Sequence, residues 1–374
     1  MKRIIKEVAV IGSGVMGSRV AAHFANIGCK VYLLDIVPKE LNDSEKKKGL
    51  TLQDKEVRNR IASDNLKNVL SAKPSPMYHS SFASRITVGN LEDNLPWLQN
   101  VDWVFEAVVE ILDVKKSVFE KVESFRKPDS LISTNTSGIP IHLMLEGRSE
   151  NFQENFCGTH FFNPPRYLQL LEIIPTPKTK PEVVDFLMDY GSLYLGKTTV
   201  LCKDTPAFIA NRIGVYSIMT VFDLMEKMHL SIKEIDTLTG PLTGKPKSAT
   251  FRTADVVGID TLVKVANNIY KDCPLDEARE IFTIPEYVNK LVANNWLGDK
   301  TGQGFYKKSR DSEGKKTILE VDVRTLEYKP SGKPNFPSVA AAKPVDNLKD
   351  RLKLFHSAQD KAGEFLRTLS FNIF

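Results

Sequence analysis

Two side chains suited to proton transfer lie close together in the stretch "GTHFFNPPRYLQLLEIIP", residues 158–175. His160 precedes two phenylalanines and a rigid Asn163-Pro164-Pro165 turn, and Glu172 is the single carboxylate in a run of leucine and isoleucine. A carboxylate in an apolar run is costly unless something compensates its charge. Glu172 therefore either points outward from a half-exposed strand or holds the imidazole of His160.

A glycine signature near the N-terminus indicates a second kind of chemistry, the binding of phosphate groups. A short apolar run from Val8 to Ile11 predicts a buried strand, a helical pattern follows it, and a second apolar run ends at Asp35. Between the first strand and the helix stands G-x-G-x-x-G, made of Gly12, Ser13, Gly14, Val15, Met16 and Gly17. In this context the signature predicts a dinucleotide site.

The three glycines have separate physical tasks in such a site. Gly12 permits the tight turn, Gly14 lets the pyrophosphate approach the backbone, and Gly17 allows the helix to pack closely on the strand. The helix N-terminus then offers free N–H groups to the phosphates. Asp35, roughly 20 residues further on, can accept hydrogen bonds from an adenosine ribose and would repel a 2′-phosphate. The expected cofactor is therefore NAD.

The elements that position these groups follow an alternating strand and helix pattern. Apolar runs at residues 86–88, in "VDWVFEAVVE" and in "SLISTNTSG" extend the start into a doubly wound, mainly parallel sheet through about residue 203. Ligands of such sheets lie beyond the carboxyl ends of the strands. We therefore expect Glu110, at the end of one run, and the Asn135-Thr136-Ser137 turn beside the cofactor, with Lys115 one helical turn beyond.

The composition changes at residue 204. Asp204-Thr205-Pro206 predicts a capped helix start, and apolar residues at helical spacing follow it. The expected domains are an NAD-binding domain over residues 1–203, a helical domain over 204–308, and a linker with the start of a further helical unit over 309–374. Within the last of these, "TILEVDVRTLEYKP" suggests a small hairpin. The predicted fold class is α/β, with a Rossmann-type doubly wound sheet domain followed by a mainly α-helical domain.

Composition and charge narrow the function classes. The net charge of +5 is spread thinly and gives little support for a nucleic-acid partner. The four cysteines lie far apart with no Cys-x-x-Cys pair, which argues against a zinc site or a disulfide framework and fits a reducing compartment. No apolar run reaches the ~20 residues that span a bilayer. We expect a soluble cytoplasmic protein without a metal site.

Six motifs in order resemble the 3-hydroxyacyl-CoA dehydrogenases of fatty-acid β-oxidation, over residues 5–308. They are "GSGVMG", "EAVVE", "STNTSG", "GTHFFNPP", "KDTPAFIANRIG" and "KTGQGFY". The resemblance implies an NAD-dependent enzyme that oxidises L-3-hydroxyacyl-CoA to 3-oxoacyl-CoA. Other details are similar to a bacterial branch in which this dehydrogenase is fused to a C-terminal enoyl-CoA hydratase. "KPKSATFRTADVVG" departs from the Gly-Pro-Phe-Glu stretch of the stand-alone enzymes.

The resemblance also implies roles for individual residues. In the family, the histidine that matches His160 is the general base, and the glutamate that matches Glu172 holds it. An imidazole titrates near neutral pH and suits this task, while a carboxylate fixes its tautomer. Ser137 would bind the substrate oxygen near the nicotinamide, and Asn211 would donate to the developing 3-keto oxygen. Cofactor contacts are implied for Asp35, Glu110, Lys115 and Lys300.

Two other functions are compatible with parts of this pattern. A β-hydroxyacid dehydrogenase of another substrate class shares the glycine-rich start but relies on a catalytic lysine. A non-catalytic NAD-binding relative would keep the fold alone. The sequence stops at "LSFNIF", inside an apolar helix pattern. We expect a truncated chain or a subunit that associates with a hydratase domain or subunit, and a homodimer is the other expected assembly.

Overall fold

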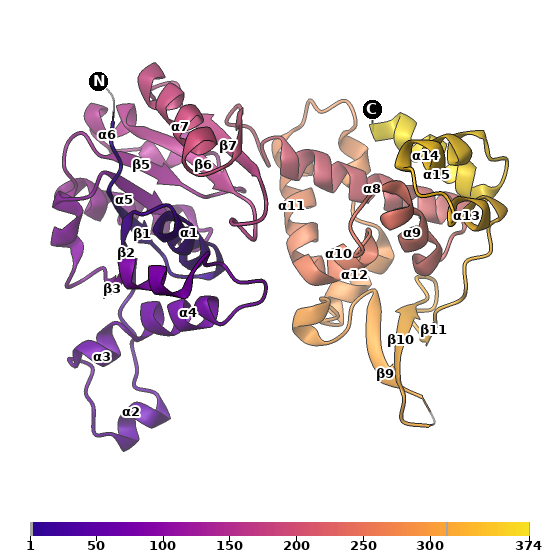
Figure 1. Cartoon of the computed structure of the whole chain (residues 1–374), viewed down its shortest axis with the longest axis horizontal. Helices are drawn as coiled ribbons and strands as arrows, with labels where there is room; N and C mark the ends of the chain where they lie inside the picture. The colour runs from indigo at the N-terminus through magenta and orange to yellow at the C-terminus, as the bar shows by residue number, and fades with distance from the viewer. Residues whose placement is uncertain (1–2, 312, 374) are drawn as a thin grey trace. The chain divides into compact units, whose positions relative to one another are not determined.

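The computed structural model describes residues 3–311 and 313–373, and the chain divides into two compact units, Met1–Ile209 and Ala210–Phe374 (Figure 1). Within the described residues, no helix is both long and apolar enough to cross a membrane.

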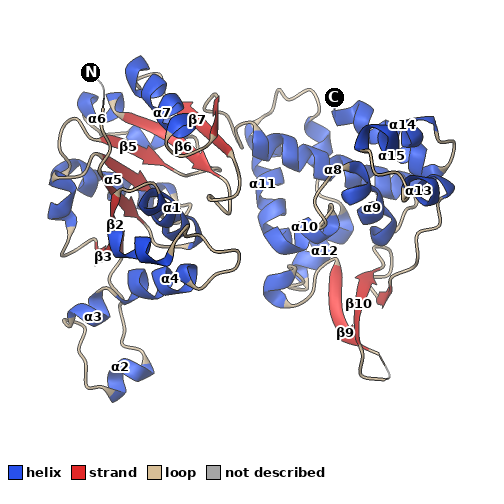
Figure 2. Cartoon of the chain, in the orientation of Figure 1, coloured by secondary structure: helices blue, strands red, loops and turns tan. Residues whose placement is uncertain are grey.

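Unit 1 is built around an 8-stranded sheet with the order β3-β2-β1-β4-β5-β6-β7-β8 (Figure 2). Its strands are β1 (Glu7–Ile11), β2 (Lys30–Asp35), β3 (Ile86–Asn90), β4 (Trp103–Glu106), β5 (Leu131–Thr134), β6 (Phe156–Phe161), β7 (Leu170–Pro175) and β8 (Thr198–Leu201). Its α-helices are α1 (Val15–Asn26), α2 (Asp43–Lys47), α3 (Lys55–Arg58), α4 (Arg60–Leu70), α5 (Leu112–Phe125), α6 (Glu150–Glu154) and α7 (Pro181–Leu193). Its 3-10 helices are η1 (Ser80–Arg85), η2 (Leu95–Gln99) and η3 (Ile141–Leu145).

The direction of the strands confirms the predicted fold class. Neighbouring strands run parallel from β3 to β6, β6 pairs antiparallel with β7, and β7 pairs parallel with β8. The carboxyl ends of β1, β2, β4 and β5 therefore lie at one edge of the sheet. This is the edge at which doubly wound sheets bind their ligands.

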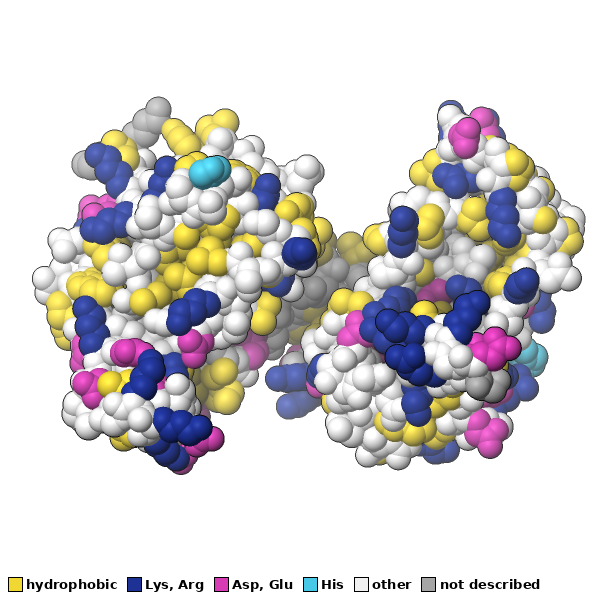
Figure 3. Space-filling model, turned by 60° about the horizontal axis from the view of Figure 1, so that its bottom comes forward, with side chains coloured by type: hydrophobic (Ala, Val, Ile, Leu, Met, Phe, Trp, Pro, Cys, Tyr) yellow, Lys and Arg dark blue, Asp and Glu magenta, His cyan; other side chains and the backbone are white. Residues whose placement is uncertain are grey.

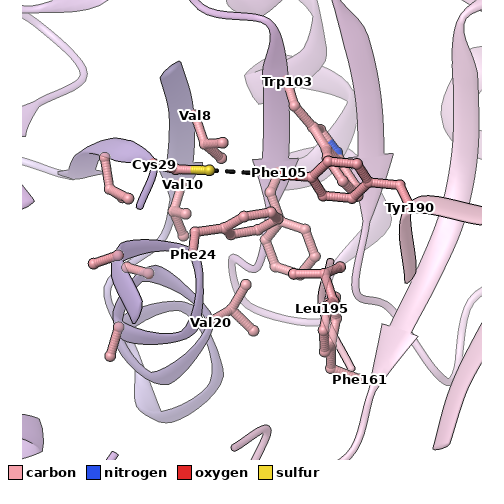
Figure 4. Packing of buried hydrophobic residues seen from close by; sticks show 14 of the residues in the cluster. Val8, Val10, Val20, Phe24, Cys29, Trp103, Phe105, Phe161, Tyr190 and Leu195 are labelled. Carbon is pink, nitrogen blue, oxygen red and sulfur yellow. Dashed lines mark hydrogen bonds between the residues drawn. The ribbon is translucent and has the colours of Figure 1, made fainter. Parts of the chain in front are cut away.

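Aromatic packing fixes α1 on the sheet. Phe24 of α1 meets Trp103 and Phe105 of β4 edge-on, with ring centroids 5.2 and 6.3 Å apart (Figure 4). Beside them the thiol of Cys29 lies 3.7 Å from the hydroxyl of Tyr190. All five side chains are buried. Because α1 is held along the sheet, its N-terminus stays at the carboxyl end of β1.

Two local expectations in unit 1 are wrong. Strand β4 ends at Glu106, not at Glu110, because the buried Glu106 carboxylate accepts a hydrogen bond from the Val108 amide at 2.6 Å and turns the chain. Apolar residues at helical spacing between residues 57 and 70 predict one amphipathic helix, but the structure has two helices there, α3 and α4. At the break between them, the Asn90 amide donates to the side chain of Asn59 at 2.8 Å.

Unit 2 is mainly helical, as predicted, with a small sheet of order β11-β10-β9. Its α-helices are α8 (Ala210–Met228), α9 (Ile232–Leu238), α10 (Phe251–Val257), α11 (Ile259–Asp272), α12 (Glu286–Ala293), α13 (Pro337–Ala342), α14 (Leu348–Ser357) and α15 (Lys361–Ile373). The 3-10 helices are η4 (Pro241–Thr243), η5 (Arg279–Phe282) and η6 (Asp299–Thr301), and the strands are β9 (Tyr306–Arg310), β10 (Lys316–Val321) and β11 (Tyr328–Pro330).

Aromatic residues also form the core of unit 2. Phe222 of α8 stacks on Phe251 with ring centroids 5.2 Å apart, and Phe251 meets Phe305 edge-on at 4.7 Å. The predicted hairpin is confirmed, because β10 and β11 pair antiparallel. Helix α15 packs against α8 and α14, so residues beyond the hairpin belong to the same compact unit.

Helix α8 begins at Ala210, so the helix start predicted at Asp204 is wrong. The Asp204 carboxylate instead accepts hydrogen bonds from the amides of Ile141 and His142, at 2.9 and 3.0 Å. Ala207 and Phe208 then take left-handed backbone angles, with φ of 61° and 47°. A helix cannot pass through two such residues.

Candidate active site

His160 and Glu172 face each other across the antiparallel pair β6 and β7. The register pairs the two residues directly, so their side chains lie on the same face of the sheet. His160 Nδ1 and Glu172 Oε2 are 2.8 Å apart. Glu172 is 0% exposed and His160 is 6% exposed. The burial of Glu172 rules out the outward-facing alternative.

The hydrogen bond assigns a state to the imidazole. An ionised carboxylate can only accept, so Nδ1 carries the proton and a neutral ring presents the lone pair of Nε2. Nε2 makes no hydrogen bond within the described part of the chain. The second oxygen of Glu172 accepts from the Ile209 amide at 3.1 Å. This geometry leaves a neutral His160 one nitrogen with which to accept a proton.

Apolar side chains surround the pair. The rings of Phe162 and Phe208 lie 4.5 and 5.7 Å from the imidazole. Cys202 is also buried, and burial, together with the nearby charge of Glu172, raises the pKa of its thiol to about 12. The thiol therefore stays neutral, and the charge beside His160 comes from Glu172.

The glycine turn has a shape that fits a dinucleotide phosphate. A β-carbon at Gly12 would lie 2.5 Å from the Ala107 carbonyl oxygen, and one at Gly17 would collide with the Gly12 carbonyl. A β-carbon at Gly14 would meet no protein atom within 4 Å. The protein's own packing thus requires glycine at the first and third positions. The space above Gly14, at the N-terminus of α1, is free for a ligand. Ser13 completes this turn, and Val15 and Met16 begin α1.

Asp35 lies at the carboxyl end of β2 and contacts the same turn. Its carboxylate accepts from the Ser13 amide at 2.6 Å and from the Ser13 hydroxyl. Asn65 of α4 donates to that hydroxyl at 2.9 Å. Within the described residues no lysine or arginine pairs with Asp35, so nothing there would offset the repulsion of a 2′-phosphate. The Asp35 carboxylate and the glycine turn together fit the ribose and phosphates of NAD.

Glu110 joins the predicted cofactor residues into one cluster. It accepts from the amides of Ser137 and Gly138, at 3.1 and 2.8 Å, and from the Thr136 hydroxyl. Its other oxygen lies 3.3 Å from Lys115 Nζ. Burial acts to raise the pKa of Glu110, but the charge of Lys115 and these hydrogen bonds outweigh it, and the pKa lies below its usual value.

Lys115 is itself 1% exposed and forms a buried ion pair with Glu106 at 2.8 Å. Its ammonium group therefore acts on the site through Glu110. The turn at residues 136–138 is also tied to the His160 strand, because Asn135 Oδ1 accepts from the Phe161 amide at 2.9 Å. The structure thus brings Ser137, Glu110 and Lys115 together at the end of β5.

The remaining two predicted residues belong to unit 2. Asn211 lies in the first turn of α8, two residues after Ile209, whose amide bonds Glu172. Lys300 lies in η6, where its Nζ is 2.5 Å from the Asp260 carboxylate. The roles of both residues stay predictions.

Sequence reasoning missed two residues that shape the site. Glu106 anchors Lys115, and its signal was present as an acid inside the apolar "WVFEAVV" run. Phe208 lies against His160 because its backbone is left-handed. No sequence pattern announces that conformation in a phenylalanine.

Comparison with known proteins places the chain in a family. Residues 7–205 match the 3-hydroxyacyl-CoA dehydrogenase, NAD binding domain, and residues 208–308 match the 3-hydroxyacyl-CoA dehydrogenase, C-terminal domain. A probable 3-hydroxyacyl-CoA dehydrogenase of Deinococcus radiodurans is 49% identical over 83% of this chain and 85% of its own length. A crystal structure of (S)-3-hydroxybutyryl-CoA dehydrogenase from Ralstonia eutropha superposes with a TM-score of 0.64 at 25% identity, over 80% of this chain and 98% of that one.

A probable 3-hydroxyacyl-CoA dehydrogenase of Bacillus subtilis is 49% identical over 98% of this chain. The chain spans about half the length of this relative, 46%. The matches to both domain models and the identity to these relatives agree with the fold. The chain belongs to the 3-hydroxyacyl-CoA dehydrogenase family.

Proposed function

We propose that the protein oxidises L-3-hydroxyacyl-CoA to 3-oxoacyl-CoA with NAD⁺, as a dehydrogenase of fatty-acid β-oxidation. The observation that carries the proposal is the buried hydrogen bond between His160 Nδ1 and Glu172 Oε2, at 2.8 Å. A base held in one tautomer is what the removal of a hydroxyl proton requires. The family and the phosphate-accepting turn at Gly14 support the same reaction.

His160 Nε2 would accept the proton of the 3-hydroxyl group as hydride leaves C3. Bound NAD⁺ supplies the hydride acceptor. The charge of Glu172 would stabilise the imidazolium that forms, and the apolar rings of Phe162 and Phe208 would strengthen this interaction by excluding water. In the reverse direction the imidazolium would return the proton to the substrate oxygen.

Ser137 and Asn211 would bind the oxygen on C3. Glu110 fixes the backbone of Ser137 and leaves its hydroxyl available, since no hydrogen bond engages that hydroxyl within the described residues. Asn211 would donate from the first turn of α8. Donors aimed at an oxygen that gains charge stabilise the transition state more than the ground state.

A reducing compartment suits this chain, and we infer that the enzyme works in the cytoplasm. All four cysteines carry free thiols, and three of them, Cys29, Cys157 and Cys202, are buried. Association with an enoyl-CoA hydratase domain or subunit stays a prediction from the resemblance, as does a homodimer.

The test is NADH oxidation with 3-oxoacyl-CoA thioesters of increasing chain length, beginning with acetoacetyl-CoA. We expect turnover with the thioesters and none with free β-hydroxyacids in the opposite direction. NADH binding without turnover of any thioester would reject the proposal and favour a non-catalytic relative. Turnover of free β-hydroxyacids would reject it in favour of the other dehydrogenase class.

A further inference from the structure

A pocket of about 440 Å³ lies on unit 2, within the part of the chain that the structure describes. Its floor is one face of the β9–β10 sheet, on which Tyr306, Lys308 and Ile318 point the same way because β9 and β10 pair Lys308 with Ile318. Helix α9 and the start of α10 contribute its walls. Figure 3 shows Lys and Arg side chains gathered on this face of unit 2. None of the residues assigned to hydride transfer lines it.

The pocket carries an excess of positive charge. Its lining holds five cationic side chains, of Lys233, Lys247, Arg252, Lys307 and Lys308, and two acidic ones, of Asp236 and Asp299. Both carboxylates are already engaged. Asp299 accepts two hydrogen bonds from Arg252, at 2.8 and 2.6 Å. Asp236 accepts from the amides of Thr250, Phe251 and Arg252.

Of the other four cations, Lys307 points to the opposite face of β9, where its Nζ lies 5.3 Å from the centre of the Tyr328 ring. No ion pair engages Lys233, Lys247, Lys307 or Lys308 within residues 3–311 and 313–373. The ammonium groups of Lys233, Lys247 and Lys308 around one pocket repel each other, and a ligand with several negative charges relieves that repulsion. Lysine binds phosphate as a compact point charge.

The floor adds a second feature. The Tyr306 hydroxyl donates to Asp236 at 2.8 Å, which fixes the ring, and Ile318 is 58% exposed beside it. A fixed ring and an aliphatic side chain inside a cationic rim favour a ligand that joins phosphate to a flat or apolar group. The volume lies within the range of small-molecule pockets.

We propose that this pocket binds a nucleotide phosphate, held by Lys233, Lys247 and Lys308 through its phosphates and by Tyr306 and Ile318 through its base. The proposal goes beyond hydride transfer and does not depend on it. A free adenosine diphosphate and the phosphorylated adenosine end of coenzyme A share this chemistry, and separate titrations distinguish these two sources.

The experiment is calorimetric titration of this chain with inorganic pyrophosphate, ADP and coenzyme A, in excess NADH so that the Gly12–Gly17 site is filled. Lys308→Glu and Ile318→Asp each place a negative charge in the pocket, and Lys315→Glu changes an exposed lysine of the same hairpin outside it. We expect ADP to bind at least about tenfold more tightly than pyrophosphate, and both pocket variants to weaken ADP by about tenfold or more. Lys315→Glu should bind ADP as the wild type does.

Three results would overturn the proposal: no ADP binding in excess NADH, equal affinity for ADP and pyrophosphate, or an unchanged ADP affinity in both pocket variants. The two variants act by different changes at exposed positions, so a folding defect in one leaves the other to decide. Turnover at saturating acetoacetyl-CoA, measured in parallel, should be unchanged in both. Loss of that turnover in the wild type would reject the proposed dehydrogenase activity and leave the pocket result standing.

Discussion

Asp35 has two roles, in coenzyme selection and in holding the phosphate turn. Its carboxylate would repel a 2′-phosphate, and it also holds Ser13 in the phosphate turn. Replacing Asp35 with serine should therefore narrow the preference for NADH over NADPH, because the repulsion is gone, and should also lower kcat/KM with NADH. Steady-state kinetics with both coenzymes measure the two effects.

Asn65→Ala is the matched control, since it removes the other partner of the Ser13 side chain and keeps the carboxylate. This variant should keep the coenzyme preference of the wild type. Equal kcat/KM for NADH and NADPH in the wild type would show that Asp35 does not face the ribose.

Lys115 and Lys116 are neighbours on α5, but Lys115 is buried and Lys116 is partly exposed. Lys115 is paired with Glu106 inside unit 1, whereas Lys116 pairs with Glu146 near the surface. Lys115→Met leaves a buried carboxylate without its cation and should lower the free energy of unfolding by about 3–5 kcal/mol. Lys116→Met should lower it by less than about 1 kcal/mol. Urea denaturation compares the two, and equal effects would contradict the role given to the Glu106 pair.

At the scale of elements, periodicity predicted the strands and helices whose apolar pattern is strong. It predicted the first strand, the glycine turn and α1 because all of β1 after Glu7 is buried and the glycines leave few alternatives. It failed where a side chain forms hydrogen bonds with the backbone of a segment distant in the sequence. The sequence predicts Asp204 as a helix cap, and its carboxylate does accept hydrogen bonds from backbone amides, but from those at the start of η3. The sequence alone indicates that this carboxylate can accept hydrogen bonds from free amides, but not which amides donate them.

Lys197 also forms hydrogen bonds with a distant backbone segment, the loop that joins β6 to β7. It is 6% exposed, and its ammonium group donates to the carbonyl oxygens of Leu168, at 2.8 Å, and Pro165. Within the described residues it has no carboxylate partner. Burial lowers the pKa of Lys197 to about 8.

The sign of the pH effect follows from this shift. Between pH 8 and the usual lysine pKa of about 10.4, the unfolded chain holds a proton that the folded chain has lost. The free energy of unfolding contributed by Lys197 should therefore rise with pH across this window, by at most roughly 3 kcal/mol. Denaturation at several pH values should show that the free energy of unfolding of the wild type, relative to that of Lys197→Met, increases across this window.

Lys180→Met is the control, because Lys180 is half-exposed and pairs with Glu154 at 2.7 Å. The difference in the free energy of unfolding between Lys180→Met and the wild type should stay constant between pH 8 and 10. A constant difference for Lys197→Met as well would mean that Lys197 is protonated throughout the window.

At the scale of the whole molecule, two of the predicted site residues, Asn211 and Lys300, belong to unit 2. Lys300 belongs to unit 2, and its Nζ pairs with Asp260. If Lys300 also serves the cofactor, Lys300→Met should weaken NADH binding severalfold in a fluorescence titration, because a cation near the phosphates is lost. Lys290→Met, which removes an exposed lysine paired with Glu286, should leave it unchanged. Identical affinities in all three proteins would remove Lys300 from the cofactor site.

The candidate site was predictable to the extent that it lies on neighbouring strands. His160 and Glu172 stand on two strands joined by a short loop, so their spacing alone made a contact reasonable. The Glu106 and Lys115 pair was not predictable, because the burial of a lysine depends on how α5 lies on the sheet. The unpaired lysines of the unit 2 pocket come from three separate segments and carry no common motif.

The central claim is that His160 and Glu172 act as one unit in proton transfer. The direct test is kcat for His160→Gln, Glu172→Gln and the double variant with acetoacetyl-CoA and NADH, alongside NADH binding. His160→Gln should lower kcat by roughly 10²–10⁴-fold with NADH affinity unchanged. The double variant should be scarcely slower than His160→Gln, since residues that act as a unit are strongly non-additive. Losses that multiply in the double variant would contradict the account, because Glu172 would then act independently of His160.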